Sequence, residues 1–125
     1  MAADDGGRKR RRLSRSGDFD RVYRDGSSHA NRYLVLYRFP RGSGGETGGE
    51  GLRLGISVGR KVGGAVQRNR VKRVLRESFW EVAGELPTDH DFVLVARRDM
   101  AELIEREGAS GAKRCIGELV EGRST

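Results

Sequence analysis

The fold is decided by the stretch GRKVGGAVQRNRVKRVLRESFW, residues 59–80, which combines a helical apolar pattern with a run of positive charge. Seven basic residues, from Arg60 to Arg76, pass before the first acidic residue, Glu77. At about 100° per residue, one face gathers the side chains expected of a helix packed on a sheet. This face consists of Val71, Val74, Leu75, Ser78, Phe79 and Val82. The stretch therefore predicts a long helix with one side in the core.

The opposite side of this helix carries the charge. When the angular position of Arg68 around the helix axis is set to zero, most of the charged side chains lie between zero and about 140°. Arg70 lies just beyond this arc, at about 200°. This basic face consists of Arg68, Asn69, Arg70, Lys72, Arg73 and Arg76. Stacked like charges such as Arg68 and Lys72 repel each other by roughly a few tenths of a kcal/mol, and an ordinary solvated helix alternates signs instead. The basic face therefore predicts binding to a polyanion, with nucleic acid as the first candidate.

Two uncharged residues share this arc. Asn69 can donate to a phosphate or a 2′-hydroxyl and can accept from a base. Trp80 lies near the same angle, where it either stacks on a base or covers a neighbouring element. The turn before the helix has the outer glycine spacing of a phosphate loop, but Ala65 and Val66 replace the lysine and the hydroxyl residue of that motif. Nucleotide hydrolysis is therefore excluded.

The composition narrows the class of partner. The chain has 125 residues, enough for one domain, and a net charge of +7, which favours an anionic partner. No apolar run approaches the roughly 20 residues that span a bilayer, so a membrane surface is the weaker candidate. Since no signal-peptide core follows Met1, we expect a cytoplasmic protein. The single cysteine, Cys115, fits a reducing compartment and is predicted to be a buried apolar residue.

The remaining pattern predicts an α+β sandwich, with helices packed against a small sheet. We expect a flexible basic arm at 1–12, one domain at 13–122 and a tail at 123–125. The glycine-rich segment 41–51 is predicted to be a flexible hairpin loop joining the first two strands. The expected elements are a short helix at 17–26, strands at 33–39, 52–58 and 91–97, a helix or helical turn at 99–107, and a terminal helix at 111–122.

Alternation along the first strand separates two sets of side chains. Tyr33, Val35 and Tyr37 take one face, and Leu34 and Leu36 take the other, so one set can be partly exposed. Exposed aromatic side chains on a sheet stack single-stranded bases with little sequence preference.

Four segments together resemble the protein subunit of bacterial ribonuclease P. They are RLSRSGDF (12–19), ANRYLVLY (30–37), SVGRKVGGAV (57–66) and RNRVKRVLRE (68–77). The resemblance implies a subunit that binds a large catalytic RNA and helps to remove the 5′ leader of precursor tRNA. It also implies that the chemistry and its Mg²⁺ belong to the RNA, so the protein carries no catalytic residue. The implied fold is an α-β sandwich with a left-handed crossover through the basic helix, although the usual rule favours the right-handed sense.

The resemblance also assigns residues to two surfaces. The basic face, together with Arg60 and Lys61, would contact the catalytic RNA and the cleavage region. A cleft between the first helix and the sheet would hold the single-stranded leader. Its matching residues here are Phe19, Tyr23, Asn31, Arg32, Val35 and Tyr37. Phe19 and Tyr23 are equally well explained as core contacts of the first helix.

Other classes fit the sequence less well. His29, expected in a loop, and His90 have no cysteine or carboxylate cluster at metal-ligand spacing, and no nucleophile motif is present, so a protein enzyme in its own right is not expected. A ribosomal protein or general RNA chaperone is the main alternative, because such proteins share basic helices and a small sheet. A helix-turn-helix DNA-binding protein lacks support, since no partner helix directly precedes Val66.

Overall fold

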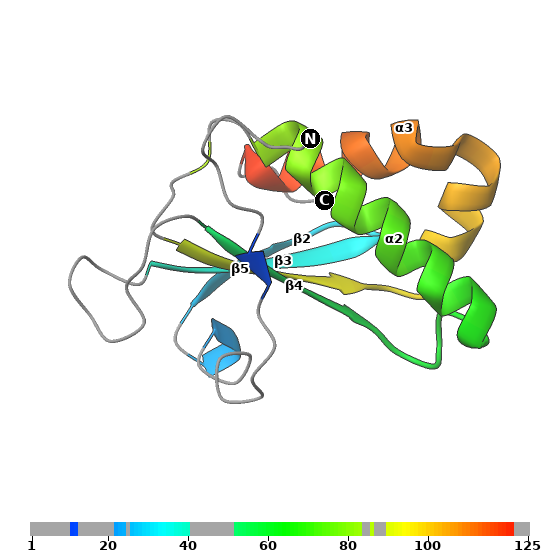
Figure 1. The fold of residues 1–125 in the computed structure, drawn as a ribbon, viewed down its shortest axis with the longest axis horizontal. Helices are drawn as coiled ribbons and strands as arrows, with labels where there is room; N and C mark the ends of the chain where they lie inside the picture. The colour runs from blue at the N-terminus through cyan, green and yellow to red at the C-terminus, as the bar shows by residue number, and fades with distance from the viewer. Residues whose placement is uncertain are drawn as a thin grey trace.

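The structure is a computed structural model that describes residues 11–12, 22–24, 26–40, 52–83, 86 and 90–121. These residues form the predicted α+β sandwich, in which two long helices cover one face of a five-stranded sheet (Figure 1). The elements are β1 (Arg11–Arg12), β2 (Ser27–Ala30), β3 (Leu34–Pro40), β4 (Arg53–Val58), α2 (Ala65–Val82), β5 (His90–Ala96) and α3 (Met100–Val120). No helix among the described residues is long and apolar enough to cross a membrane.

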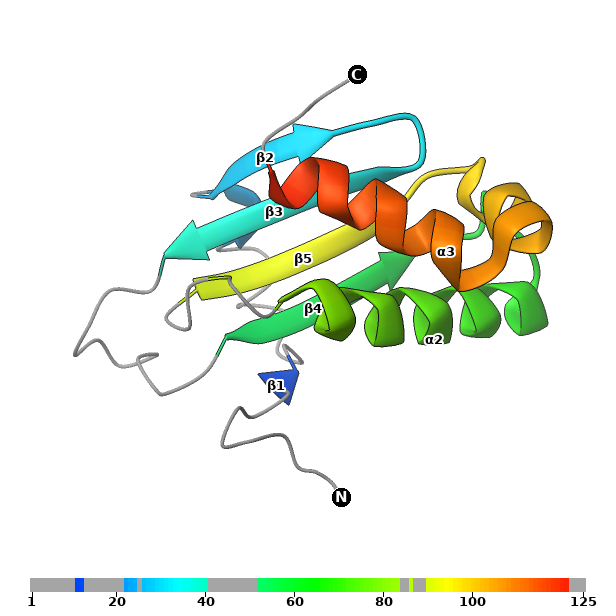
Figure 2. The ribbon, with the colours of Figure 1, turned by 90° about the horizontal axis from the view of Figure 1, so that it is seen from above.

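The strand order is β1-β4-β5-β3-β2, which Figure 2 shows from above. β5 pairs in parallel with β4 and antiparallel with β3, so it separates the two strands that precede it in the chain. The predicted hairpin between β3 and β4 is therefore wrong. The physical reason lies in β5, where Phe92, Val93 and Leu94 are all fully buried and need cover on both faces, as the centre of a sheet provides.

α2 connects the parallel neighbours β4 and β5. This is the predicted crossover through the basic helix, and its left-handed sense stays a prediction. An ion pair fixes the register of the two strands where β5 begins. Both nitrogens Nε and Nη2 of Arg53 donate to the carboxylate oxygens of its register partner Asp91, at 2.8 Å each. Asp91 is fully buried, so this bidentate contact is needed to hold its charge in the sheet.

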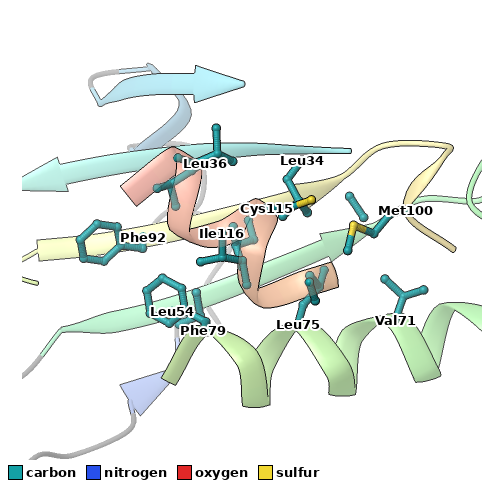
Figure 3. Close-up of a cluster of buried hydrophobic side chains, with 14 of the residues drawn as sticks. Leu34, Leu36, Leu54, Val71, Leu75, Phe79, Phe92, Met100, Cys115 and Ile116 are labelled. Atoms are coloured by element: carbon teal, nitrogen blue, oxygen red, sulfur yellow. The ribbon is translucent and has the colours of Figure 1, made fainter. Parts of the chain in front are cut away.

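The main core lies between the sheet and the two helices. From α2, the side chains of Val71, Leu75 and Phe79 point toward the sheet and α3 (Figure 3). They meet the inward side chains of three strands and of α3, which include Leu34, Leu36, Leu54, Phe92, Leu94, Cys115 and Ile116. The predicted apolar face of the basic helix is thus confirmed, and Ser78 on it is also buried.

α3 consists of two helical segments that meet at Gly108. This residue has φ 63° and ψ −148°, a conformation that is essentially restricted to glycine. The chain bends there, and the segment after the bend runs back over the sheet (Figure 2). The two helical pieces predicted at 99–107 and 111–122 therefore match the two segments, and Gly111 is buried within the second one.

A smaller apolar cluster lies on the other face of the sheet. Val22, from the helical turn at 22–24, packs against Val93, and the turn appears in blue below the sheet in Figure 1. The rest of the predicted first helix, with Phe19, lies outside the described residues, as does the segment 41–51. Two short edge strands were not predicted. One is β1, at the end of the predicted arm, and the other is β2, which includes His29.

Candidate nucleic-acid interface

The basic face of α2 is open to solvent. Asn69, Arg70 and Arg73 are exposed, whereas Arg68, Lys72 and Arg76 are half-buried along the sides of the helix. The first turn of α2 contains no acidic residue, and its N-cap is a glycine without a capping side chain. The positive end of the helix dipole therefore adds to the charge of the side chains.

These cations are not paired with any carboxylate that the structure describes. Among the residues that the structure describes, none of the six basic-face residues and neither Arg60 nor Lys61 forms an ion pair or a side-chain hydrogen bond. The Nε atom of Arg68 is even buried without an acceptor. Like charges at this spacing repel each other, so a surface of this kind is stabilised when a polyanion binds.

Trp80 does not belong to this surface. Its side chain is 9% exposed and meets Phe79 edge to face, with ring centroids 5.4 Å apart. Of the two roles left open by the sequence, the structure favours packing over base stacking. The cationic arc of α2 thus ends at Arg76, nearly two turns before the C-terminus of the helix, and the buried aromatic residues follow it.

A second cationic surface lies at the carboxyl ends of β4 and β5. An open groove of about 1010 Å³ is lined there by one acidic residue, Asp99, and by five basic residues. We call it the cationic groove, after Arg32, Arg60, Lys61, Arg97 and Arg98. Parallel strands end at the same edge, and the register partners Val58 and Ala96 bring the two following segments together. Arg60 and Lys61 therefore line the same groove as Arg32, a residue that was predicted to lie in the leader cleft.

Arg97 and Arg98 were not predicted as binding residues. They follow β5, which ends at Ala96, one residue before the end of the predicted strand at 91–97, and the sequence alone does not reveal which other strand ends beside it. The signal that could have found them is the pair of consecutive arginines after a buried strand. Once β4 and β5 are known to be parallel neighbours, their position beside the turn at 59–62 follows.

Arg32 is held at the edge of the groove by an acidic residue. Its Nε donates to Asp99 Oδ2 at 2.9 Å, and its guanidinium lies 5.6 Å from the centre of the Tyr33 ring. The hydrogen bond that Arg32 donates to Asp99 raises the pKa of Arg32 above its ordinary value, so the guanidinium stays charged. The two remaining nitrogens of the guanidinium stay available to an outside anion.

Asn31 differs from its predicted position in the leader cleft. Its side chain is buried, 3% exposed, and its amide nitrogen donates to the carbonyl oxygen of Cys115 and to Glu118 Oε1, at 3.3 Å each. Both acceptors belong to α3, on the helix-covered face of the sheet. A direct contact with RNA is therefore not open to this side chain.

The remaining leader-cleft residues that the structure describes lie on the other face of the sheet. The rings of Tyr23 and Tyr37 meet edge to face, with centroids 4.9 Å apart, and Tyr23 is 39% exposed. Val35 and Tyr37 are half-buried on β3, as the alternation predicts. We call this surface the aromatic face. Val95, the register partner of Val35, packs against the same small cluster as Tyr37 and also lines the cationic groove, so the two surfaces adjoin each other.

The described residues contain no group of three or more histidine, cysteine or acidic residues that could hold a metal ion. Burial raises the pKa of the Cys115 thiol to about 11, which keeps it neutral and makes it a poor nucleophile.

A helix-covered sheet, with a row of cations that have no acidic partner among the described residues, defines a small basic protein of the nucleic-acid-binding class. The family model that matches the chain, over residues 8–119, is described as Ribonuclease P. The chain belongs to the family of the ribonuclease P protein component, a subunit of a ribonucleoprotein endonuclease that processes the 5′ end of tRNA.

The sequences of individual relatives match this chain over most of their length. The ribonuclease P protein component of Shouchella clausii is 42% identical over 100 residues, which cover 80% of this chain and 78% of the relative. That of Bacillus pumilus is 39% identical, with 80% of each protein covered.

Solved structures support the same fold. The RNase P protein of Staphylococcus aureus superimposes with a TM-score of 0.73 at 30% identity, covering 90% of this chain and 94% of that one. The RNase P protein of Thermotoga maritima gives the same TM-score at 32% identity, with 87% and 94% covered.

Proposed function

We propose that this chain binds the catalytic RNA of ribonuclease P through the basic face of α2 together with Arg60 and Lys61. The observation that carries this proposal is the absence of acidic partners for these cations among the described residues. Arginine predominates over lysine on the basic face, which suits bidentate contacts with phosphate. Each such contact releases counterions, so we expect the affinity to fall steeply with salt concentration.

The aromatic face is proposed to contact the single-stranded 5′ leader of precursor tRNA. Tyr23 and Tyr37 offer ring surface to bases, and stacking of this kind tolerates any base. Val95 belongs to both surfaces, which supports a path for the RNA leader from the aromatic face into the cationic groove. The phosphates of the leader would then lie near Arg97 and Arg98. This arrangement suits a factor that acts on many different precursor tRNAs.

The division of labour follows from the chemistry of the two partners. The RNA supplies the catalytic groups and the Mg²⁺ that the cleavage requires, and the protein supplies affinity for the RNA and for the leader. The proposed location is the cytoplasm. The protein itself is proposed to need no cofactor.

The decisive experiment is cleavage of a precursor tRNA by a bacterial ribonuclease P RNA at low-millimolar magnesium, with and without this protein. Strong stimulation supports the proposal. Binding to that RNA without stimulation contradicts it and favours a general RNA-binding protein instead.

A second experiment tests the aromatic face. The double variant Phe19→Ala with Tyr37→Ala is expected to reduce the discrimination between precursor tRNA and mature tRNA, because only the precursor carries a leader. Measured dissociation constants for both RNAs give the result. An equal loss of affinity for both RNAs identifies the two residues as core contacts only.

A further inference from the structure

We infer that Asn31 is a positioning residue of the cationic groove, which holds Arg97 and the turn carrying Arg32 in place for RNA. The inference rests on the proposed function, since it assumes that the groove receives phosphates. It concerns a residue that the sequence predicts as a direct contact and that the structure buries.

Asn31 uses every hydrogen-bonding position of its side-chain amide. Its Oδ1 accepts from the backbone N–H groups of Tyr33 and Leu34, at 2.9 Å each. Its Nδ2 donates to the carbonyl of Cys115 and to the carboxylate of Glu118. Two acceptor sites and two donor sites are the full capacity of the amide. A buried polar network of this kind fixes one geometry, because every alternative leaves a buried group unpaired.

The backbone of Asn31 connects this buried network to an arginine of the groove. Its carbonyl oxygen accepts from Nη1 of Arg97 at 2.9 Å. The backbone N–H of Arg97 donates in turn to the carbonyl of Tyr33, also at 2.9 Å. The turn at 31–33 and the end of β5 are thus tied together by two bonds, with α3 as the support behind them.

The anchored guanidinium remains useful to a ligand. Arg97 is exposed, and one bond from Nη1 leaves its other N–H groups free for a phosphate. An arginine that is already held loses less side-chain entropy when it binds. Arg32, next to Asn31 in the same turn, benefits in the same way. Asn31 therefore acts on RNA affinity through these two arginines and without touching the RNA.

The test compares Asn31→Ala, Arg97→Gln and the double variant, using the full chain and a bacterial ribonuclease P RNA over a range of salt concentrations. We expect Asn31→Ala to weaken binding by about threefold to tenfold and Arg97→Gln by a similar factor. Each variant should also lower the slope of log affinity against log salt by about 0.7 to 1, since one phosphate contact is lost. The double variant should lose less affinity than the sum of the two single losses, because the Arg97 contact that Asn31→Ala weakens is already absent in Arg97→Gln.

A role confined to folding predicts a different pattern. In that case Asn31→Ala lowers the melting temperature, the salt slope of the folded protein stays at the wild-type value, and the losses of the two variants add. Either an unchanged slope or additive losses would overturn the inference. Gly108→Ala provides the matched control, because it destabilises α3 at a site away from the groove and should leave the slope unchanged.

Two measurements keep the outcome clear. If Asn31→Ala does not fold, Glu118→Ala replaces it, since this change removes only one of the four bonds and predicts a smaller loss in the same direction. If the wild-type protein fails to stimulate cleavage, the proposed function is wrong, and binding to a single-stranded oligouridylate then tests the groove by itself. Wild-type stimulation with no effect of Asn31→Ala on slope or affinity rejects the inference alone.

Discussion

α2 and α3 cover the same face of the sheet and both bury apolar side chains in the main core, but their charged side chains differ in pairing. In α3, the cations Arg106, Lys113 and Arg114 all pair with carboxylates. The pairs of Arg106 and Arg114 lie within α3 itself, and the pair of Lys113 joins α3 to Glu81 of α2, at 2.6 Å. On the basic face of α2, no described cation has such a partner.

The difference teaches how to tell a supporting helix from a binding helix. Both helices are rich in charged residues, so the number of charged residues alone does not separate them. Pairing does, because a helix that only covers the sheet gains from neighbouring opposite charges, whereas a helix that binds a polyanion keeps its cations free. The comparison predicts that changes in α3 affect stability and that changes on the basic face affect RNA affinity.

The largest expected effect concerns the buried side of α3. Ile116 is fully buried in the core, and Ile116→Ala should lower the free energy of unfolding by about 2 to 5 kcal/mol through lost burial and a residual cavity. Urea unfolding followed by circular dichroism measures this change. RNA binding by the folded fraction should keep its wild-type salt slope, and a lower slope would break the comparison.

The next effect concerns the exposed side of α2. Arg70→Ala should weaken RNA binding by about 1 to 3 kcal/mol if its contact with phosphate is charge-assisted, and its effect on stability should be small. Arg114→Ala on α3 is the matched control, since it removes one exposed arginine that is already paired with Glu107. Filter binding at several salt concentrations gives both affinities. Equal losses for the two variants would mean that net charge alone controls binding.

A moderate effect is expected at the bend of α3. Gly108→Ala should cost about 1 to 2 kcal/mol, because φ is 63° there and no atom lies within 4 Å of the added Cβ, so the cost comes from the backbone. Gly117→Ala, in the regular part of α3 with equally open surroundings, should instead stabilise the helix by about 0.5 to 1 kcal/mol. Thermal unfolding of both variants distinguishes the two backbone states. The same sign for both would contradict the bend.

The smallest effect concerns one of the ion pairs of α3. The hydrogen bond from Arg114 lowers the pKa of Glu107 below its ordinary value. A carboxylate with a lowered pKa in the folded state stabilises the protein above its unfolded pKa, and this contribution disappears as the pH falls through the folded pKa. The melting temperature of Glu107→Gln should therefore lie slightly below that of the wild type at neutral pH and converge with it in acid. A difference that persists in acid would point to another cause.

Patterns within one element were sufficient to predict much of this molecule. The buried and exposed sides of α2 follow from the helical period, and the burial of Leu34 and Leu36 beside half-buried Val35 and Tyr37 follows from the strand period. The order of the strands could not be predicted in this way. A hairpin between β3 and β4 satisfies the local pattern equally well, and only the long-range pairing of β5 with both strands decides against it.

The same limit applies to the site. The basic face was visible because its residues share one helix, whereas the cationic groove combines residues from three separate segments of the chain. Arg97 and Arg98 belong to this groove because β4 is the parallel neighbour of β5, and the sequence does not identify that neighbour. Asn31 carries no local sign of burial either, since its partners Cys115 and Glu118 are more than 80 residues away along the chain.

The central place of β5 has a consequence for synthesis on the ribosome. β3 and β4 leave the ribosome first, but each must wait for β5 before its longest ladder of backbone hydrogen bonds can form. α2 is also made before β5, so its apolar side emerges ahead of the complete sheet that it covers. Pairing between strands that are far apart in the sequence slows folding, and it leaves apolar surface of the nascent chain exposed to solvent until β5 is available. We therefore expect the sheet to close only after residue 96 has left the exit tunnel.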